Sequence, residues 1–432
     1  MGTEKQKMKR WNLHSAGVRI AFCQTLVTID TQEKRLYPYF MTLKRSIRNR
    51  RTPDYKDFVH TEPGTLNGKY MRLFWQPVYR SKDLPPAHAK PIRIMSEDFT
   101  LYRGEEGAPH VVAFRCAHRG TQLSAGWVEG DCLRCVYHGW KYDGSGQCIE
   151  QPAEEKPFAQ KIRIRSCPTK EYLGLIFAYF GAGEPPPFPR YSHFEGEGIL
   201  DTLPILLWPC NFFQHLENAG DAAHLPFTHR DSYFSADARS GIPTAISRAE
   251  TSWGLVTRVT FPGGAKQIYN FGMPNIHDIR IPAPDPQIPW DDRIAWTVPV
   301  ADDVCVTFRV RHLPITGEAA ARYLERQKSA PAAEGPTSEE LGEAVLSGRI
   351  RFQDLRNAAK SPIAYVNAQD YVAQVGQGGI ADRSNEHLGR SDLGVILFRK
   401  IWERELRALK GKRRLKQWTV SGPELEERGL EV

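Results

Sequence analysis

The sequence predicts an α+β protein in which an all-β domain is followed by an antiparallel sheet backed by helices. Short β-like runs, separated by Gly and Asp turns, fill the first half of the chain after residue 55. Strand-like runs dominate residues 251–312, and helix-like segments follow them. Between the halves, Gly181-Ala-Gly-Glu-Pro-Pro-Pro-Phe-Pro-Arg190 predicts a stiff linker, because clustered prolines favour extended backbone. We expect an extension 1–55, an all-β domain 56–180, a linker 181–190, a second domain 191–420 and a tail 421–432.

The net charge of +8 is concentrated at the N-terminus. Residues 1–51 hold 12 Lys and Arg against 3 Asp and Glu, so the rest of the chain is close to neutral. A basic leader is no evidence for a nucleic-acid-binding face on the folded body, so no nucleic-acid partner is expected. We expect the extension to be disordered or loosely helical and without chemistry; a transit peptide and a translation start at Met41 are the alternatives.

Other classes of protein are disfavoured by composition. No apolar run is long enough to cross a membrane, and eight cysteines in 432 residues do not suggest a secreted disulfide framework. The Gly-rich segments near Gly144 and Gly263 follow no strand–helix pattern, so no dinucleotide site is expected. Cysteines that serve as free thiolates indicate a reducing compartment, and we expect the cytoplasm.

Two short motifs carry metal chemistry in the first domain. Cys116-Ala-His118 is followed, after 16 intervening residues, by Cys135-Val-Tyr-His138, and a glycine at a turn comes soon after each motif. Two thiolates can hold one iron and two imidazoles the other, which is the ligand set of a Rieske 2Fe–2S centre. Neutral imidazoles raise the potential of such a cluster, which suits a centre that receives electrons and passes them on.

A zinc site is the alternative reading of these residues. Cys132 lies three residues before Cys135, which is the spacing of a zinc knuckle. Zinc would leave the regular Cys116-x-His118 motif unexplained, so we interpret Cys132 as an ordinary strand thiol. Trp140 is expected to pack over the cluster. The surrounding strands are expected at 91–95, 99–102, 110–114, 161–165 and 173–180.

A second group of candidate ligands lies after the linker. His224 and His229 are five residues apart, which on a regular helix leaves them about 140° out of alignment. Pro226 between them is expected to break the helix and let His229 swing back. Asp221 precedes His224 by three residues, which predicts one helical face for both, whereas His215 is expected to be structural.

These motifs resemble those of the Rieske non-haem iron oxygenases, in the phthalate-dioxygenase-like type of α-subunit. The matching segments are Cys-x-His-Arg-Gly, Tyr-His-Gly-Trp and Asp-x-x-His-x-x-x-x-His, and the resemblance spans roughly residues 56–420. Phe58–Thr65 and Cys116–Leu123 look close to the dehydrodivanillate-type O-demethylases. The resemblance implies a Rieske domain followed by a helix-grip catalytic domain.

The resemblance also implies roles for individual residues. His224 and His229, with a distant carboxylate that we assign to Asp370, would hold a mononuclear Fe(II) as a facial triad. Asp382 and Glu386 are interpreted as structural ion-pairing acids. Asp221 would bridge His224 to His138 of a neighbouring subunit in a head-to-tail homotrimer (or trimer of trimers), with support from Asn218.

The implied activity is that of a terminal oxygenase. With O₂ and electrons from a separate NAD(P)H-dependent reductase or ferredoxin, it would oxidise an aromatic, carboxylated substrate by hydroxylation or by oxidative O-demethylation. A Rieske electron carrier or a zinc-binding regulator is the alternative. His224, His229 and Asp370 argue against the first, and a visible spectrum separates the second, because zinc leaves the protein colourless whereas a 2Fe–2S cluster is red-brown. Candidate partners for a substrate carboxylate are Asn270, His277, Arg309, Arg311 and His312.

The rest of the second domain is predicted from its patterning. Helical segments are expected within 317–360, as an insertion, lid or subunit contact, and at 391–409, with Ser391 as the N-cap. Strands are expected at 251–260, 267–273, 293–300 and 304–312.

Overall fold

The computed structural model describes residues 54–232, 241–281, 288, 290–329 and 335–419, together with the backbone of 429–431. All of them belong to one compact unit, Leu43–Val432. The expected extension 1–55 lies outside the described residues except for its last two positions, as does the expected tail 421–432 except for the backbone of 429–431.

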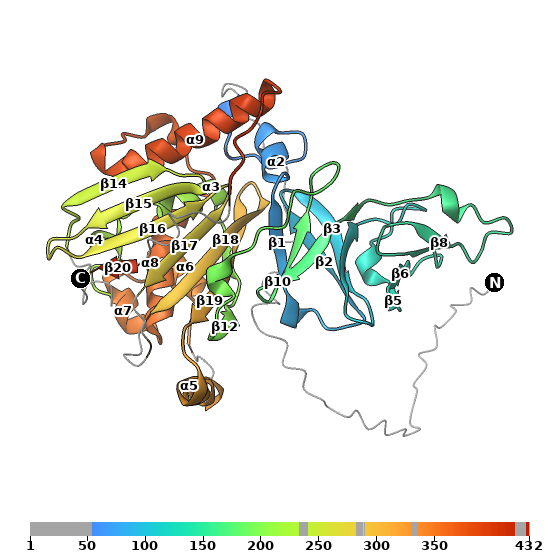
Figure 1. Ribbon diagram of the computed structural model, residues 1–432, viewed down its shortest axis with the longest axis horizontal. Coiled ribbons are helices and arrows are strands. Elements are labelled where there is room, and N and C mark those ends of the chain that lie inside the picture. The colour runs from blue at the N-terminus through green and yellow to red at the C-terminus, as the bar shows by residue number, and fades with distance from the viewer. Residues whose placement is uncertain are drawn as a thin grey trace, which may run out of the picture. The chain divides into compact units, whose positions relative to one another are not determined.

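Three small antiparallel sheets form the region before residue 180 (Figure 1). Their strands are β1 (Trp75–Arg80), β2 (His88–Ile94), β3 (Glu97–Arg103), β4 (Pro109–Ala113), β5 (Trp127–Glu129), β6 (Cys132–Arg134), β7 (Lys141–Tyr142), β8 (Cys148–Glu150), β9 (Ser166–Cys167), β10 (Thr169–Tyr172) and β11 (Leu175–Tyr179). The strand orders are β2-β3-β4-β9, β5-β6-β7-β8 and β1-β11-β10. The expected all-β character is confirmed, but the strand expected at 161–165 is wrong. That segment follows a 3₁₀ turn that ends at Lys161, and it makes a single bridge from Arg163 to Gln147. The Gln147 side chain donates to the carbonyls of Ala159 and Ile162 at 2.9 and 3.0 Å, which holds the turn beside the bridge.

The two Cys/His motifs lie on the loops that follow β4 and β6. The core beneath them contains Tyr102, Val112, Leu133, Tyr142 and both motif cysteines, all buried. The cysteines are therefore anchored in the apolar core of this region rather than at its surface.

A larger antiparallel sheet follows, with the order β12-β19-β18-β17-β16-β15-β14. Its strands are β12 (Ile199–Thr202), β14 (Ala245–Glu250), β15 (Gly254–Thr260), β16 (Lys266–Gly272), β17 (Ile276–Ile281), β18 (Asp291–Ala301) and β19 (Val304–Leu313). Two short strands, β13 (Leu206–Trp208) and β20 (Gly429–Glu431), pair with β19 and β16. This is the antiparallel sheet that the sequence predicts.

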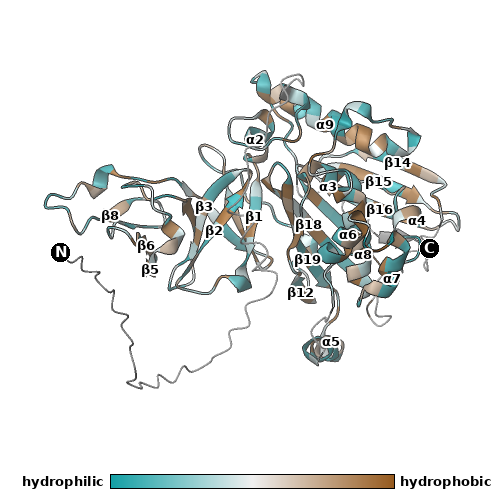
Figure 2. Ribbon diagram, turned by 180° about the vertical axis from the view of Figure 1, so that it is seen from behind, coloured by the Kyte–Doolittle hydropathy of each residue, from teal (hydrophilic) through white to brown (hydrophobic). Residues whose placement is uncertain are grey.

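Helices cover one face of this sheet (Figures 1 and 2). The described helices of this region are α3 (Phe212–Ala219), α4 (Leu225–Thr228), α5 (Gly317–Ser329), α6 (Ser338–Leu346), α7 (Leu355–Ala358), α8 (Pro362–Val375) and α9 (Leu393–Lys410). In both views α3 and α8 lie on the same face of the sheet, and α9 runs beside β14 and near α2 (Leu66–Met71). Helix α6 packs on α8, with Leu341 buried against Tyr365 and Ala368. Ser391 is not the N-cap of α9, because the helix starts at Leu393 and the Asp392 carboxylate turns back to the Gly389 amide.

Hydrogen bonds tie the two sheet regions together. Met95 and Ser96, at the turn between β2 and β3, donate backbone amides to the carbonyls of Pro299 and Val300 at 2.7 and 3.0 Å. The Asn275 amide donates to Gln76 Oε1 at 2.8 Å. The proline-rich segment 181–190 packs on this junction, where Trp75 Nε1 donates to the Pro186 carbonyl at 3.0 Å. None of the described helices is long and apolar enough to cross a membrane.

Candidate metal centres and active site

The two Cys/His motifs fold into matching turns. The Gly120 amide donates to the Cys116 carbonyl at 2.9 Å, and the Gly139 amide donates to the Cys135 carbonyl at 3.0 Å. Both glycines have positive φ, 78° and 73°, a conformation that a side chain would strain. Local sequence thus presents each cysteine, and the histidine two or three residues after it, in the same way.

The cysteines and histidines differ in exposure. Cys116 and Cys135 are 4% and 2% exposed, whereas His118 and His138 are half-buried and their rings lie 4.5 Å apart, centroid to centroid. Trp140 is buried and stacks on His118 at 4.6 Å. The thiol end of the site faces the core, and the imidazole end faces outward.

The donor set fits a two-iron cluster. His118 Nδ1 is buried without a hydrogen-bond partner, and Cys116 and Cys135 are not joined in a disulfide. Burial raises the pKa of the Cys116 thiol, so an uncharged thiol there would be favoured over a bare thiolate, and bound iron would stabilise the thiolate. Among the described residues, no three of these ligand atoms gather as closely as a single zinc ion would require.

The second histidine pair is placed by a short helix. Gly220 ends α3, and α4 is a single turn with His224 at its N-terminal end and His229 at its C-terminal end. The prediction that Pro226 breaks a helix between the two histidines is wrong. Pro226 lies in the first turn of α4, where its missing N–H leaves no helical hydrogen bond unmade. His229 can turn toward His224 because α4 ends after a single turn.

Asp221 does not share a helix with His224. It lies in a turn, where its Oδ1 accepts from the Ala223 amide at 2.8 Å. Its Oδ2 is 3.7 Å from His224 Nδ1, slightly beyond a hydrogen bond. The prediction that Asp221 and His224 share a helical face is wrong, although the two side chains do lie close together.

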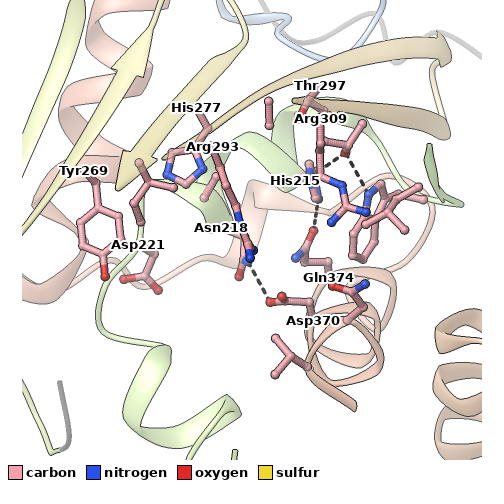
Figure 3. A pocket seen from close by; sticks show the side chains of 18 of the residues that line it. His215, Asn218, Asp221, Tyr269, His277, Arg293, Thr297, Arg309, Asp370 and Gln374 are labelled. Carbon is pink, nitrogen blue, oxygen red and sulfur yellow. Dashed lines mark hydrogen bonds between the residues drawn. The ribbon is translucent and has the colours of Figure 1, made fainter. Parts of the chain in front are cut away.

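Asp370, on α8, meets both histidines. Its Oδ1 lies 3.4 Å from His229 Nε2 and 4.0 Å from His224 Nε2. One ligand atom from each of the three residues lies within 4.8 Å of the others. Asn218 Nδ2 donates to the same Asp370 oxygen at 3.2 Å (Figure 3). Two imidazoles and one carboxylate that converge in this way fit a mononuclear iron with open positions.

Gln369 fixes the orientation of His229, a role that the sequence did not predict. Its Oε1 is 3.0 Å from His229 Nδ1, so Nδ1 carries the proton and Nε2 keeps its lone pair. Both residues are buried, at 1% and 2% exposure. A nearby imidazole, His215, is engaged at both nitrogens, by Gln374 and Thr307, which agrees with its expected structural role.

A cavity of about 240 Å³ opens beside the three converging side chains. It lies between the sheet and α8, and Figure 3 shows His277, Arg309, Asn218 and Asp370 around it. Its apolar wall is formed by Leu206, Ile279, Ile281, Ile294, Ile363 and Val366. Of the residues expected to contact a substrate carboxylate, His277 and Arg309 line it, whereas Asn270, Arg311 and His312 are not part of the described lining.

Comparison with known proteins supports this picture. The Rieske [2Fe-2S] domain model matches residues 74–171, which contain both Cys/His motifs. The phenoxybenzoate dioxygenase subunit alpha of Ectopseudomonas oleovorans is 31% identical, over 79% of this chain and 82% of its own. The 5,5'-dehydrodivanillate O-demethylase oxygenase subunit of a Sphingobium species is 28% identical, over 80% of this chain and 77% of its own.

Solved structures share the fold. Pseudomonas putida CBB5 NdmA QL mutant with caffeine superposes with a TM-score of 0.61 at 19% identity, covering 82% of this chain and 95% of that one. The terminal oxygenase of carbazole 1,9a-dioxygenase from Nocardioides aromaticivorans gives 0.57 at 19% identity, covering 80% and 100%.

The chain belongs to the Rieske oxygenase family. Within that family it is the terminal oxygenase subunit, an O₂-dependent oxidoreductase that uses a Rieske 2Fe–2S cluster and a catalytic iron.

Proposed function

We propose that Cys116, His118, Cys135 and His138 hold the cluster, and that His224, His229 and Asp370 hold the catalytic iron. The observation that carries the iron site is the convergence of two imidazole Nε2 atoms and one carboxylate oxygen beside a cavity. When bound, the iron supplies O₂ activation and the cluster supplies single electrons. The same convergence is unexplained if the chain is only an electron carrier.

The chain's own residues prepare the site for an aromatic ring. Gln369 holds His229 in one tautomer, and Asn218 holds Asp370 by its Oδ1. The isoleucine-rich wall of the cavity desolvates the ring and limits water near the reacting carbon. We propose ring hydroxylation or oxidative O-demethylation as the reaction. In the latter, a methoxy group, O₂, two electrons and two protons give a phenol, formaldehyde and water.

Electrons come from a separate NAD(P)H-dependent reductase or ferredoxin in this proposal. A carbazole dioxygenase oxygenase with the same fold has been solved as a complex with its ferredoxin. We further propose a cytoplasmic head-to-tail homotrimer in which His138 of one subunit meets Asp221 of the next. Both residues are accessible, because His138 is half-buried and Asp221 is 24% exposed.

The reaction is tested by product analysis with purified protein, a surrogate reductase and NADH. A panel of methoxylated and unsubstituted aromatic acids should include compounds that stimulate NADH and O₂ consumption. Formaldehyde formed in proportion to the NADH and O₂ consumed identifies O-demethylation. A hydroxylated product without formaldehyde identifies hydroxylation. The proposal would be contradicted if protein that contains both the cluster and the catalytic iron oxidises no aromatic compound in the panel.

Gln369→Leu is expected to weaken Fe(II) binding at the catalytic site about 10- to 100-fold, because His229 loses the partner that fixes its tautomer. The measurement is a titration of Fe(II) into protein that keeps its cluster. Gln369→Glu, which retains an acceptor, should largely restore the affinity. Gln374→Leu is the matched control, since Gln374 bonds His215 from the same helix; an equal loss in that variant would contradict the assignment.

Tyr142→Phe is expected to lower the reduction potential of the cluster. Tyr142 Oη lies 3.2 Å from Cys116 Sγ, and a hydroxyl that donates to a cluster sulfur stabilises the reduced form. A net hydrogen bond of about 1 kcal/mol corresponds to a shift of roughly 40 mV for a one-electron couple. Redox titration by visible absorbance measures it. Tyr102→Phe is the control, because Tyr102 donates to the Asp131 carbonyl instead.

A further inference from the structure

Three arginines lie close together on the paired strands β18 and β19, and two of them, Arg293 and Arg309, line the catalytic cavity. Arg293 Nη2 lies 2.7 Å from Asp291 Oδ2, and Arg311 Nη2 lies 3.2 Å from Asp201 Oδ2. Arg309 has no acidic partner among the described residues. Its Nη2 donates to the Pro204 carbonyl at 3.2 Å, and its Nε is buried without a hydrogen-bond partner.

Strand register explains why Arg309 differs from Arg311. The β12 strand pairs Asp201 directly with Arg311 and ends at Thr202, opposite Val310. The next pairing on β19 is Leu206 with Thr307, from β13. Arg309 therefore lies just beyond the end of β12, opposite Leu203, whose amide donates to the Arg309 carbonyl at 3.0 Å. The residue across from Arg309 is apolar, whereas the one across from Arg311 is an acid. Its other cross-strand neighbour is Ala295, which also lines the cavity and is small.

The surroundings of Arg309 call for an anion. Burial, and then the positive charges of Arg293 and Arg311, lower its pKa to about 10, so it remains a cation at neutral pH. A partly desolvated cation that faces like charges and lacks an acid is unfavourable unless a ligand neutralises it. The guanidinium lines the cavity, so the missing partner is a group that enters with the substrate.

A second polar group projects from the same sheet as Arg309, two strands away (Figure 3): His277 pairs with Ala295, which pairs with Arg309. His277 Nε2 is buried without a hydrogen-bond partner, and His277 lines the same cavity from β17. Burial lowers the pKa of His277 to about 4, so the ring is neutral and suits an uncharged polar substituent rather than a second anion. The cavity volume of about 240 Å³ is below the range of roughly 300–1,000 Å³ typical of drug-sized ligands, which favours a single ring.

We infer that the cavity takes a single-ring aromatic carboxylate, with the carboxylate on Arg309 and a hydroxyl or methoxy substituent toward His277. This inference rests on the proposed catalytic role of the cavity. Family membership alone does not set the charge of the substrate, because the relatives include a phenoxybenzoate dioxygenase and a tert-butanol monooxygenase.

The test measures equilibrium binding to the full-length protein by calorimetry, with the cluster and iron present and no reductase. The probes are benzoate, 4-methoxybenzoate and the neutral 4-methoxybenzamide. Wild type should bind 4-methoxybenzoate at least about 10-fold more tightly than the amide. Arg309→Met should weaken both carboxylates about 10- to 100-fold and leave the amide unchanged. Arg309→Lys should recover part of the loss.

Two further variants separate this role from a structural one. Arg311→Gln removes a cation from the same face of the same strand, but one that Asp201 neutralises, and should leave binding of the carboxylates unchanged. His277→Leu should weaken 4-methoxybenzoate while sparing benzoate. The inference is overturned if wild type binds no carboxylate at millimolar concentration, does not prefer acid to amide, or if Arg309→Met weakens all three probes equally.

The outcome is separable from that of the proposed function. If the protein oxidises a neutral aromatic compound but binds no carboxylate, the proposed oxygenase site stands and only the proposed role of Arg309 is wrong. Failure of His224, His229 and Asp370 to bind iron would instead remove the proposed catalytic site, whatever the cavity binds.

Discussion

Asp370→Ala will abolish turnover while leaving the Rieske cluster in place. Asp370 is the only carboxylate of the converging group, and its Oδ1 lies 3.4 and 4.0 Å from the two histidine Nε2 atoms. Burial raises its pKa, but His229 and then His224 lower it by more, so the group is an anion at neutral pH. Loss of the anionic ligand that we propose should reduce iron affinity by more than about 100-fold, since even residues that only bond a ligand are worth about 10- to 100-fold.

Iron content and colour measure this effect separately. Iron should fall from about three to about two atoms per chain, while the visible spectrum of the cluster is retained. Asp382→Ala is the matched control from the same region: Asp382 is exposed and its carboxylate only caps the turn at Ser384. A variant of Asp370 that keeps its third iron and its activity would rule out this residue as a ligand.

The turns at the two Cys/His motifs could be predicted from local sequence, because each turn is closed by a hydrogen bond within its own motif. The turn from Cys116 to Gly120 and the turn from Cys135 to Gly139 need only a glycine with positive φ, so spacing predicts them. The same logic failed for Asp221, because it assumed that α3 continued through Gly220. The N-cap predicted at Ser391 is also wrong: the Asp392 carboxylate accepts from the Gly389 amide, and α9 begins at Leu393, later than predicted.

Residues that act through the tertiary fold could not be found by spacing. Asp370 lies 141 positions after His229, and only resemblance to a family singled it out. Gln369 faces His229 because α8 packs beside α4, and no local pattern announces that contact. Strand alternation places Arg309 and Arg311 on the same face of β19, so the sequence alone does not tell them apart. The register of β12 places Asp201 opposite Arg311, and this acid therefore neutralises Arg311 and not Arg309.

A mixture of two inactive variants will recover activity if electrons cross between subunits. His138→Ala removes a proposed cluster ligand, and Asp370→Ala removes a proposed iron ligand, so each variant alone should be inactive. The two chains are co-expressed with different affinity tags, and oligomers that contain both are isolated by two successive purifications. In a head-to-tail ring of three, every mixed ring has one contact in which an intact cluster faces an intact iron site. About one third of the wild-type rate per chain is therefore expected.

Electron transfer within one chain predicts a different result, since no chain in the mixture has both centres intact and the rate would be zero. Isolated oligomers of either variant carrying both tags give the baseline. The outward face of the cluster favours recovery: the cysteines are buried, whereas His138 is half-buried beside Tyr137, which is 54% exposed. At the other centre, Asp221 is 24% exposed and lies 3.7 Å from His224 Nδ1. Each chain thus offers an accessible imidazole at one centre and an accessible carboxylate at the other, a pair that head-to-tail assembly would join.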